Sequence, residues 1–225
     1  MTLLRTLFGA ALILALGACA SSPPVHYYSL DDGQPREVGS PTGLRVAVTQ
    51  VNLPDVVDRP QLVIRSIGHQ LRLDDQHEWA EPLRRQIPRL VARDLAGVLD
   101  SGRVVALPID AQDYQLDFKV MLDIQRMEVV AGQGVDLDVV WRVEARDGDV
   151  FFGRSLVRKP IETAAASSDY QAAVAAQNLA LQTVAANIAA GITDWLDQAA
   201  ADGHSADRSA VPAAPSSRRG RGNGI

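Results

Sequence analysis

Apolar and polar positions alternate along several stretches of the chain, and this alternation predicts β-strands. Within residues 44–48 every second residue is apolar, which is the period of a strand with one buried face. Two shorter strands are expected at residues 61–65 and 70–73, and the Ile67-Gly68 pair between them favours a hairpin. The first part of the domain is therefore predicted to contain short strands.

The longest alternation extends over residues 114–124 and shifts by one position at Gln125-Arg126. Because such a shift turns the following side chains to the other face of the strand, a β-bulge is expected there. Returning strands are predicted at residues 135–145 and 150–158, so the three strands form an antiparallel meander. Its far face carries Asp136, Asp138, Arg142 and Glu144. We expect that face to contact water or a partner.

Two segments repeat their apolar residues at spacings of three and four, which predicts amphipathic helices at residues 81–99 and 168–195. Pro82 falls in the first turn, where its missing N–H is tolerated, whereas Pro88 is expected to kink the helix interior. Ser168 and Gln171 fit a capping box. The predicted fold is a single α/β (α+β) domain, a mainly antiparallel mixed sheet with two long amphipathic helices packed on one face.

The N-terminus has a different pattern, an unbroken apolar run over residues 7–16 preceded by Arg5. This run is typical of a secretory signal peptide and too short to span a bilayer comfortably. It ends in Leu16-Gly17-Ala18-Cys19, which resembles a bacterial lipobox. The resemblance implies removal of residues 1–18 and lipidation of Cys19 on its sulfur and its amine, with palmitate-type acyl chains. The alternative is a soluble secreted protein in which Cys19 stands there by chance.

Composition agrees with one exported domain. Cys19 is the single cysteine among 225 residues, so no disulfide can form and no second thiol is left for catalysis. The net charge of −5 does not favour nucleic-acid binding, which needs a basic face. Residues 19–41 are expected to be the lipidated cysteine and a tether, residues 42–200 the domain, and residues 201–225 a disordered tail rich in Ala, Gly, Ser, Pro and Arg.

Candidate catalytic chemistry is sparse. The nearest resemblance to a metal cluster is a set of four side chains in what is predicted to be one solvated loop: Asp74, Asp75, His77 and Glu78. This set lacks helical histidine spacing and a ligand from a third element. Neither His69 nor His77 accompanies a nucleophile turn of the Gly-x-Ser-x-Gly type. We therefore expect no enzyme activity, no metal and no cofactor.

Three blocks of sequence resemble the ABC-type transport auxiliary lipoproteins, the PqiC-like (YmbA-like) group. They are Tyr27-Tyr28-Ser29-Leu30, the segment Leu53-Pro54-Asp55 followed by Asp58-Arg59-Pro60-Gln61-Leu62-Val63-Ile64-Arg65, and Trp79-Ala80-Glu81-Pro82-Leu83. The resemblance extends from Tyr27 to about Leu196. It implies a lipoprotein that works with a mammalian-cell-entry (MCE) domain protein and an inner-membrane permease or ABC transporter in lipid transport between membranes.

The two later blocks have a structural and a functional interpretation. Asp58-Arg59-Pro60 fits a turn ahead of a strand, and Trp79 fits a core aromatic at a helix entry. The functional alternative is a docking surface for the MCE protein or for another copy of this chain. The candidate docking residues are Pro54, Asp55, Asp58, Arg59, Pro60 and Trp79.

The implied location is the periplasmic face of the outer membrane, with the chain anchored through Cys19. In many Gram-negative bacteria an Asp directly after the lipidated cysteine retains a lipoprotein in the inner membrane, and this chain has Ala20 there. The implied function is that of an accessory subunit that supports membrane integrity and docks the MCE protein. The alternative from another class is a lipoprotein activator or scaffold of peptidoglycan synthesis.

Overall fold

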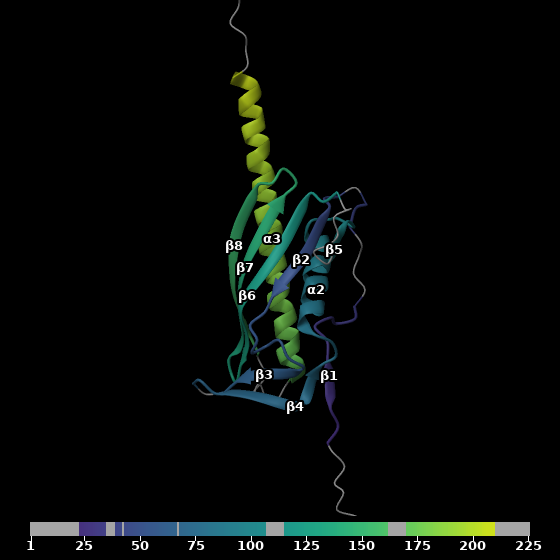
Figure 1. Cartoon of the computed structure of the whole chain (residues 1–225), viewed down its shortest axis with the longest axis vertical. Helices are drawn as coiled ribbons and strands as arrows, with labels where there is room; N and C mark the ends of the chain where they lie inside the picture. Colours follow the sequence, from purple (N-terminus) through teal and green to yellow (C-terminus); the bar gives the residue numbers. More distant parts are fainter. Residues whose placement is uncertain are drawn as a thin grey trace, which may run out of the picture.

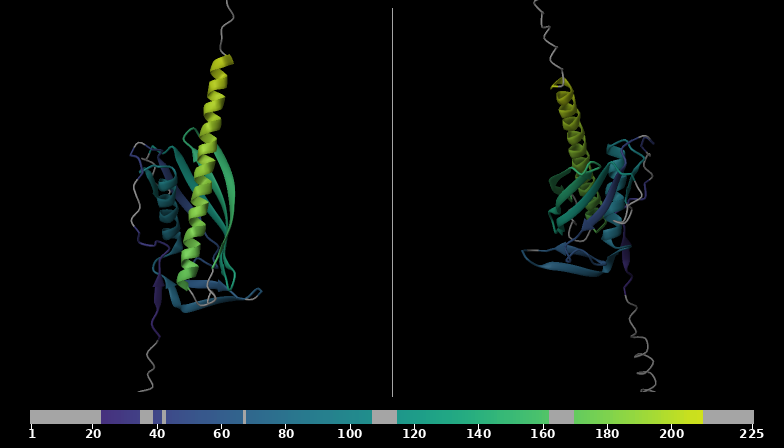
Figure 2. Two further views of the ribbon diagram at one scale, coloured as in Figure 1. Left: turned by 180° about the vertical axis from the view of Figure 1, so that it is seen from behind. Right: turned by 45° about the horizontal axis from the view of Figure 1, so that its top comes forward.

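The computed structural model describes residues 23–34, 39–41, 43–66, 68–106, 115–161 and 170–209, with side chains to residue 201. An eight-stranded mixed sheet carries two helices on one face, which confirms the predicted fold class (Figure 2). The signal peptide, Cys19 and residues 210–225 lie outside the described residues.

The strands form one sheet in which the long central strand β6 has different neighbours along its length. Their bounds are β1 His26–Tyr28, β2 Val46–Asn52, β3 Gln61–Arg65, β4 Leu71–Trp79, β5 Val104–Ala106, β6 Phe118–Val130, β7 Gly134–Ala145 and β8 Val150–Pro160. β6 pairs with β7 along one edge, and its other edge pairs in parallel first with β2 and then, at its end, with β3. β3 and β4 therefore lie across the lower end of the molecule (Figure 1).

The predicted meander is confirmed as β6, β7 and β8. The register between β6 and β7 shifts between Ile124 and Arg126, where the bulge was expected. Gly132 adopts φ 72° and Gly134 φ 139° in the turn between these strands, a conformation that a side chain would strain. The long antiparallel ladders follow directly from the strict alternation of the sequence.

The hairpin of β3 and β4 is confirmed, but its second strand is longer than predicted. The prediction that Asp74, Asp75, His77 and Glu78 lie in a solvated loop is wrong, because these residues belong to β4. A run of polar residues gives no alternation to detect. The strand continues because β3 and β1 offer backbone partners on its two edges.

Both helices pack on the same face of the sheet. α2 spans Leu83–Val98 with Pro82 at its N-cap and continues through Pro88. α3 spans Tyr170–Ser209, so it extends beyond the predicted end at residue 195 and projects past the sheet (Figure 1). The prediction of a disordered tail is therefore wrong for residues 201–209. The apolar stripe ends at Leu196, but the alanines that follow it favour helix on their own. Ser168 lies outside the described residues.

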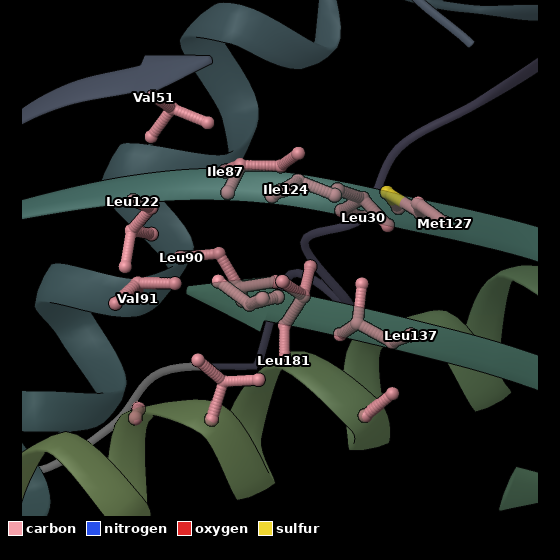
Figure 3. Close-up of a cluster of buried hydrophobic side chains, with 14 of the residues drawn as sticks. Leu30, Val51, Ile87, Leu90, Val91, Leu122, Ile124, Met127, Leu137 and Leu181 are labelled. Carbon is pink, nitrogen blue, oxygen red and sulfur yellow. The ribbon is translucent and has the colours of Figure 1, made fainter. Parts of the chain in front are cut away.

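The core fills the space between the sheet and the two helices. Figure 3 shows Leu122 and Ile124 of β6 and Leu137 of β7 with side chains of α2 and with Leu181 of α3. Many of these side chains are fully buried, and α2 and α3 also contact each other. Burial of apolar surface therefore holds the helices on the sheet.

The domain begins earlier in the chain than residue 42. β1 pairs in parallel with β4 as an edge strand, within the segment that was expected to be a tether. Leu30 is buried, and its backbone is held by Gln86 of α2 (N to Oε1, 2.8 Å) and by Asn178 of α3 (Nδ2 to O, 2.5 Å). Residues 26–30 are thus part of the fold and not of a free tether.

Candidate docking surfaces

The loop of residues 53–60 and the start of α2 meet in the structure. The backbone N–H of Trp79 donates to the carbonyl oxygen of Pro60 at 2.7 Å. Arg84, on the first turn of α2, donates from Nε to Asp58 Oδ2 at 2.5 Å. The fold therefore brings the two sequence blocks together, although 18 residues separate Pro60 from Trp79 in the sequence.

Within this group, the contacts support the structural interpretation for several residues. Trp79 is buried and belongs to the hydrophobic core, so its ring is not available to a partner. The backbone N–H groups of Val57 and Asp58 both donate to the carbonyl oxygen of Pro54, which closes a turn. Asp55 and Pro60 are exposed and remain available for contact.

The polar residues of β4 form a cluster with the N-terminal end of α3. The rings of His77 and Tyr170 stack with centroids 3.6 Å apart, and His77 Nδ1 is 2.8 Å from the Tyr28 hydroxyl. The Tyr170 hydroxyl donates to Asp74 Oδ2 at 2.5 Å and accepts a hydrogen bond from Arg72 at 3.0 Å. The cluster holds β1 and β4 against α3, across more than 90 positions of sequence.

The environment of this cluster shifts three pKa values. The hydrogen bond from Tyr170 lowers the pKa of Asp74, because it stabilises the carboxylate. Burial raises the pKa of Tyr170 to about 12, and the bond to Asp74 adds to that effect. Burial also lowers the pKa of His77, which favours a neutral ring. These groups are arranged for structure, since a neutral His77 stacks on Tyr170 without needing a counter-charge.

The face of the sheet opposite the helices carries a different surface on β7 and β8. Phe151 contacts Trp195 of α3 and Ser155 bonds to Asn187 of α3, so these side chains point toward the helices. Because side chains alternate along a strand, Phe152 and Leu156 point to the other face. They are 66% and 73% exposed, the two largest values among the exposed apolar residues of the described chain.

Ion pairs surround these two apolar side chains. Arg154 binds Asp138 through Nε and Nη2 at 2.8 and 2.6 Å, and Arg158 binds Asp136 in the same way at 2.6 and 2.9 Å. These bonds lower the pKa of both aspartates. A groove of about 400 Å³ adjoins Leu156 on this face. Aspartates predicted to lie on the far face therefore do so, each with an arginine partner.

β8 is also an edge strand of the sheet. It pairs with β7 along nearly its whole length, and no described strand pairs with its other edge. Alternate residues of this eleven-residue strand thus present backbone N–H and C=O groups to the outside. We define the docking face as the surface of β8, and of the adjoining residues of β7, that is turned away from the helices. It is centred on Phe152 and Leu156.

The sequence predicted that this face contacts water or a partner, but it did not single out Phe152 and Leu156, and the candidate docking residues were placed in the loop near Pro60 and at Trp79. The signal was present, because Phe151-Phe152 and Leu156-Val157 place apolar residues on both faces of one strand. When helices cover one face of a sheet and the other face is open to water, an edge strand needs apolar side chains only on the covered face. Apolar residues on the second side indicate a surface that is covered by something else.

Other classes of site find little support in the described part of the chain. Within it, no group of three His, Cys, Asp or Glu side chains is arranged to hold a metal ion. None of the helices there combines the length and the apolar character that crossing a bilayer requires.

Comparison with known proteins gives one family and a fold. The family model described as "ABC-type transport auxiliary lipoprotein component" matches residues 28–189. A crystal structure of an uncharacterized protein superposes with a TM-score of 0.60 at 18% identity, covering 76% of this chain and 99% of the other. A Xanthomonas campestris protein of the family DUF330 superposes with a TM-score of 0.53 at 21% identity, covering 77% and 99%. Among curated proteins, none matches significantly.

Proposed function

The chain belongs to the ABC-type transport auxiliary lipoprotein family, and from this membership and the docking face we propose that it is an accessory subunit of an MCE/ABC-type intermembrane lipid transport system. Family membership implies membrane anchoring and association with a transport system. In the proposal, Cys19 anchors the chain at the periplasmic face of the outer membrane. The domain docks the periplasm-spanning MCE protein, whose other end meets the inner-membrane permease or ABC transporter.

The observation that carries the proposal is the exposure of Phe152 and Leu156 on an open sheet face. Large apolar side chains that gather on one exposed surface mark an interaction site, because their burial against a partner is favourable. The paired charges of Arg154 and Arg158 lie beside them and provide a polar rim. The rim supplies specificity and the apolar centre supplies affinity.

The free edge of β8 adds a second mode of contact. An extended segment of a partner can pair with this edge through main-chain hydrogen bonds while its side chains contact Phe152 and Leu156. An edge of eleven residues is long enough to fix the register of such a segment. The docking face therefore fits a partner with an extended strand more closely than it fits a small ligand.

We propose that the chain supplies no chemistry of its own. His77, whose pKa is lowered by burial, is already engaged by two tyrosines, because Tyr170 stacks on its ring and the Tyr28 hydroxyl bonds to its Nδ1. A holding role needs only an anchor and a binding surface. The anchor restricts the docking face to the membrane surface, which raises its effective concentration for the partner.

Photo-crosslinking in cells tests the proposal directly. A photoreactive amino acid replaces Phe152 in the lipidated protein, and captured partners are identified by mass spectrometry. The same replacement at Leu179, which is 52% exposed on α3, is the matched control. We expect an MCE-domain protein at position 152 and not at position 179. Capture of peptidoglycan synthases at position 152, without an MCE protein, would overturn the proposal in favour of a role in cell-wall synthesis.

A growth assay links the surface to the proposed role. The double variant Phe152→Asp with Leu156→Asp is expected to fold, because both side chains are exposed, and to sensitise cells to detergent. The matched variant Leu179→Asp is expected to leave resistance unchanged. Equal resistance of the double variant and the wild type, at equal protein levels, contradicts a role of the docking face in membrane integrity.

A further inference from the structure

β1 begins at the end of the domain where β3 and β4 lie, opposite the end at which α3 projects (Figure 1). β1 begins at His26, so only residues 20–25 separate it from Cys19. Even when fully extended, the seven residue-to-residue steps from Cys19 to His26 span at most about 25 Å. If Cys19 carries the lipid anchor, as the proposed function requires, this end of the domain lies close to the bilayer.

The β3–β4 hairpin has an inner and an outer face. Arg72 and Asp74 bond to the Tyr170 hydroxyl of α3, so their side chains point inward, toward the helix. Leu71 and Leu73 alternate with them and therefore point outward. The register pairs Leu73 with Val63 of β3, which places Val63 on the same outer face. Leu73 is 44% exposed although it is apolar.

β1 extends this outer face. His26 and Tyr28 contact the ring of His77 on the inner side, so Tyr27 between them points outward. Tyr27 is 65% exposed, and Val25, two positions earlier, is also exposed. We define the outer patch as the outward-facing apolar side chains of β1, β3 and β4 together with Val25, which directly precedes β1: Val25, Tyr27, Val63, Leu71 and Leu73.

The outer patch lies at the end of the domain where β1 begins. β3 and β4 cross below the first turn of α3 in Figure 1 and in the left view of Figure 2, so their inner face is turned to the helix and their outer face away from the domain. The outer patch and the start of β1 therefore lie at the same end. A short tether and an apolar surface at one end favour the same neighbour, the bilayer that holds the anchor.

We propose that the outer patch rests on the surface of this bilayer, with Tyr27 and Leu73 in the headgroup region. Tyrosine suits this position because its ring is apolar and its hydroxyl remains hydrated. Arg65, two positions from Val63 on β3, is paired with Glu128. Binding therefore depends on apolar contact and does not require anionic lipid. The contact orients the domain so that α3 projects away from the membrane.

Fluorescence of the lipidated protein in vesicles tests the proposal. Cys19 is the only cysteine and its thiol carries lipid in the anchored protein, so an introduced cysteine is a unique labelling site. Leu73→Cys and Tyr27→Cys are labelled with an environment-sensitive fluorophore, with Leu179→Cys and Phe152→Cys as controls. The proteins are placed at low density in phosphatidylcholine and phosphatidylethanolamine vesicles containing a headgroup-labelled quencher lipid. We expect several-fold stronger quenching at positions 27 and 73 than at the controls, unchanged by salt.

Three results would overturn the proposal. Equal quenching at positions 73 and 179 would mean that the outer patch does not rest on lipid. A fluorophore at position 73 that is shielded from water only at high protein density, and loses this shielding when the protein is diluted in lipid, would mean that a second copy of this chain covers the patch. If the wild-type protein does not float with the vesicles, Cys19 does not anchor it, and the premise of the proposal is false. If the outer patch does not contact the bilayer, a partner can still be captured at Phe152. The proposal made here and the proposed function can therefore fail independently.

Discussion

The indole of Trp141 is enclosed by two glycines, and this arrangement predicts a large effect of a small substitution. Gly153 of β8 lies directly opposite Trp141 in the register, and Gly191 of α3 approaches the ring from the helix layer. A Cβ atom at position 153 would lie 2.0 Å from Trp141 Cζ2. The indole cannot move freely, because Nε1 donates to Ser155 Oγ at 3.2 Å and the ring meets Phe151 edge to face.

The expected cost of Gly153→Ala follows from these contacts. Overpacking a close-packed interior costs about 1–3 kcal/mol. If the ring shifts enough to break its bond to Ser155, the buried N–H adds about 1–3 kcal/mol. The lower conformational entropy of alanine in the unfolded chain recovers roughly 0.5–1 kcal/mol. We therefore expect a net loss of about 2 kcal/mol, which lowers Tm by roughly 4–8 °C for a domain of this size.

Chemical and thermal unfolding of the chain carrying Cys19→Ser measures this loss. Gly97→Ala is the matched control, because Gly97 lies in α2 and a Cβ atom there would meet no described atom within 4 Å outside its own helix. That change should stabilise the domain by up to ~1 kcal/mol, since alanine favours helix. Trp141→Phe removes the clashing ring atoms, so its combination with Gly153→Ala should cost less than the sum of the single variants. A neutral Gly153→Ala would refute the packing described for Trp141.

Three further predictions concern the core, the β4 cluster and the anchor. Leu181→Ala, fully buried on α3, should cost ~2–5 kcal/mol in a denaturant titration, whereas the exposed Leu179→Ala should cost little. Because burial lowers the pKa of His77 from its ordinary 6.5, the unfolded chain binds more protons below that pH and the free energy of unfolding should fall as pH drops below about 6.5. His77→Phe keeps the stacking and should flatten that decline; an unchanged pH profile would exclude His77 as its source. Cys19→Ser should abolish labelling of the protein by an alkyne fatty acid, and equal labelling would exclude the lipobox.

The elements with strong local periodicity were predictable from sequence. The bulge at Ile124 to Arg126 and the meander that contains it follow from side-chain alternation, which a strand with one buried face imposes on neighbouring residues. The stripe of α3 predicted its packing face in the same way. Its end was predicted too early, because periodicity reports where a helix contacts the core and not where the backbone stops being helical.

The candidate docking residues show the limit of this approach. Similarity of short blocks singled out residues 54–60 and Trp79, and the fold does bring them together through the Trp79 to Pro60 hydrogen bond. Burial of Trp79, however, is a property of the whole core. Exposure of Phe152 depends equally on which face of β8 the helices cover, so the local pattern places apolar residues on both faces but does not show which of them stay exposed.

By itself, the sequence determined the meander and the two amphipathic helices, because each depends on residues within a few positions of one another. Tertiary structure alone decided the parallel pairing of β6 with β2 and β3, and the extension of β4 through polar residues between two partners. It also decided which apolar side chains remain outside. These features depend on contacts between distant segments, whose free energy is realised only when the whole sheet has formed.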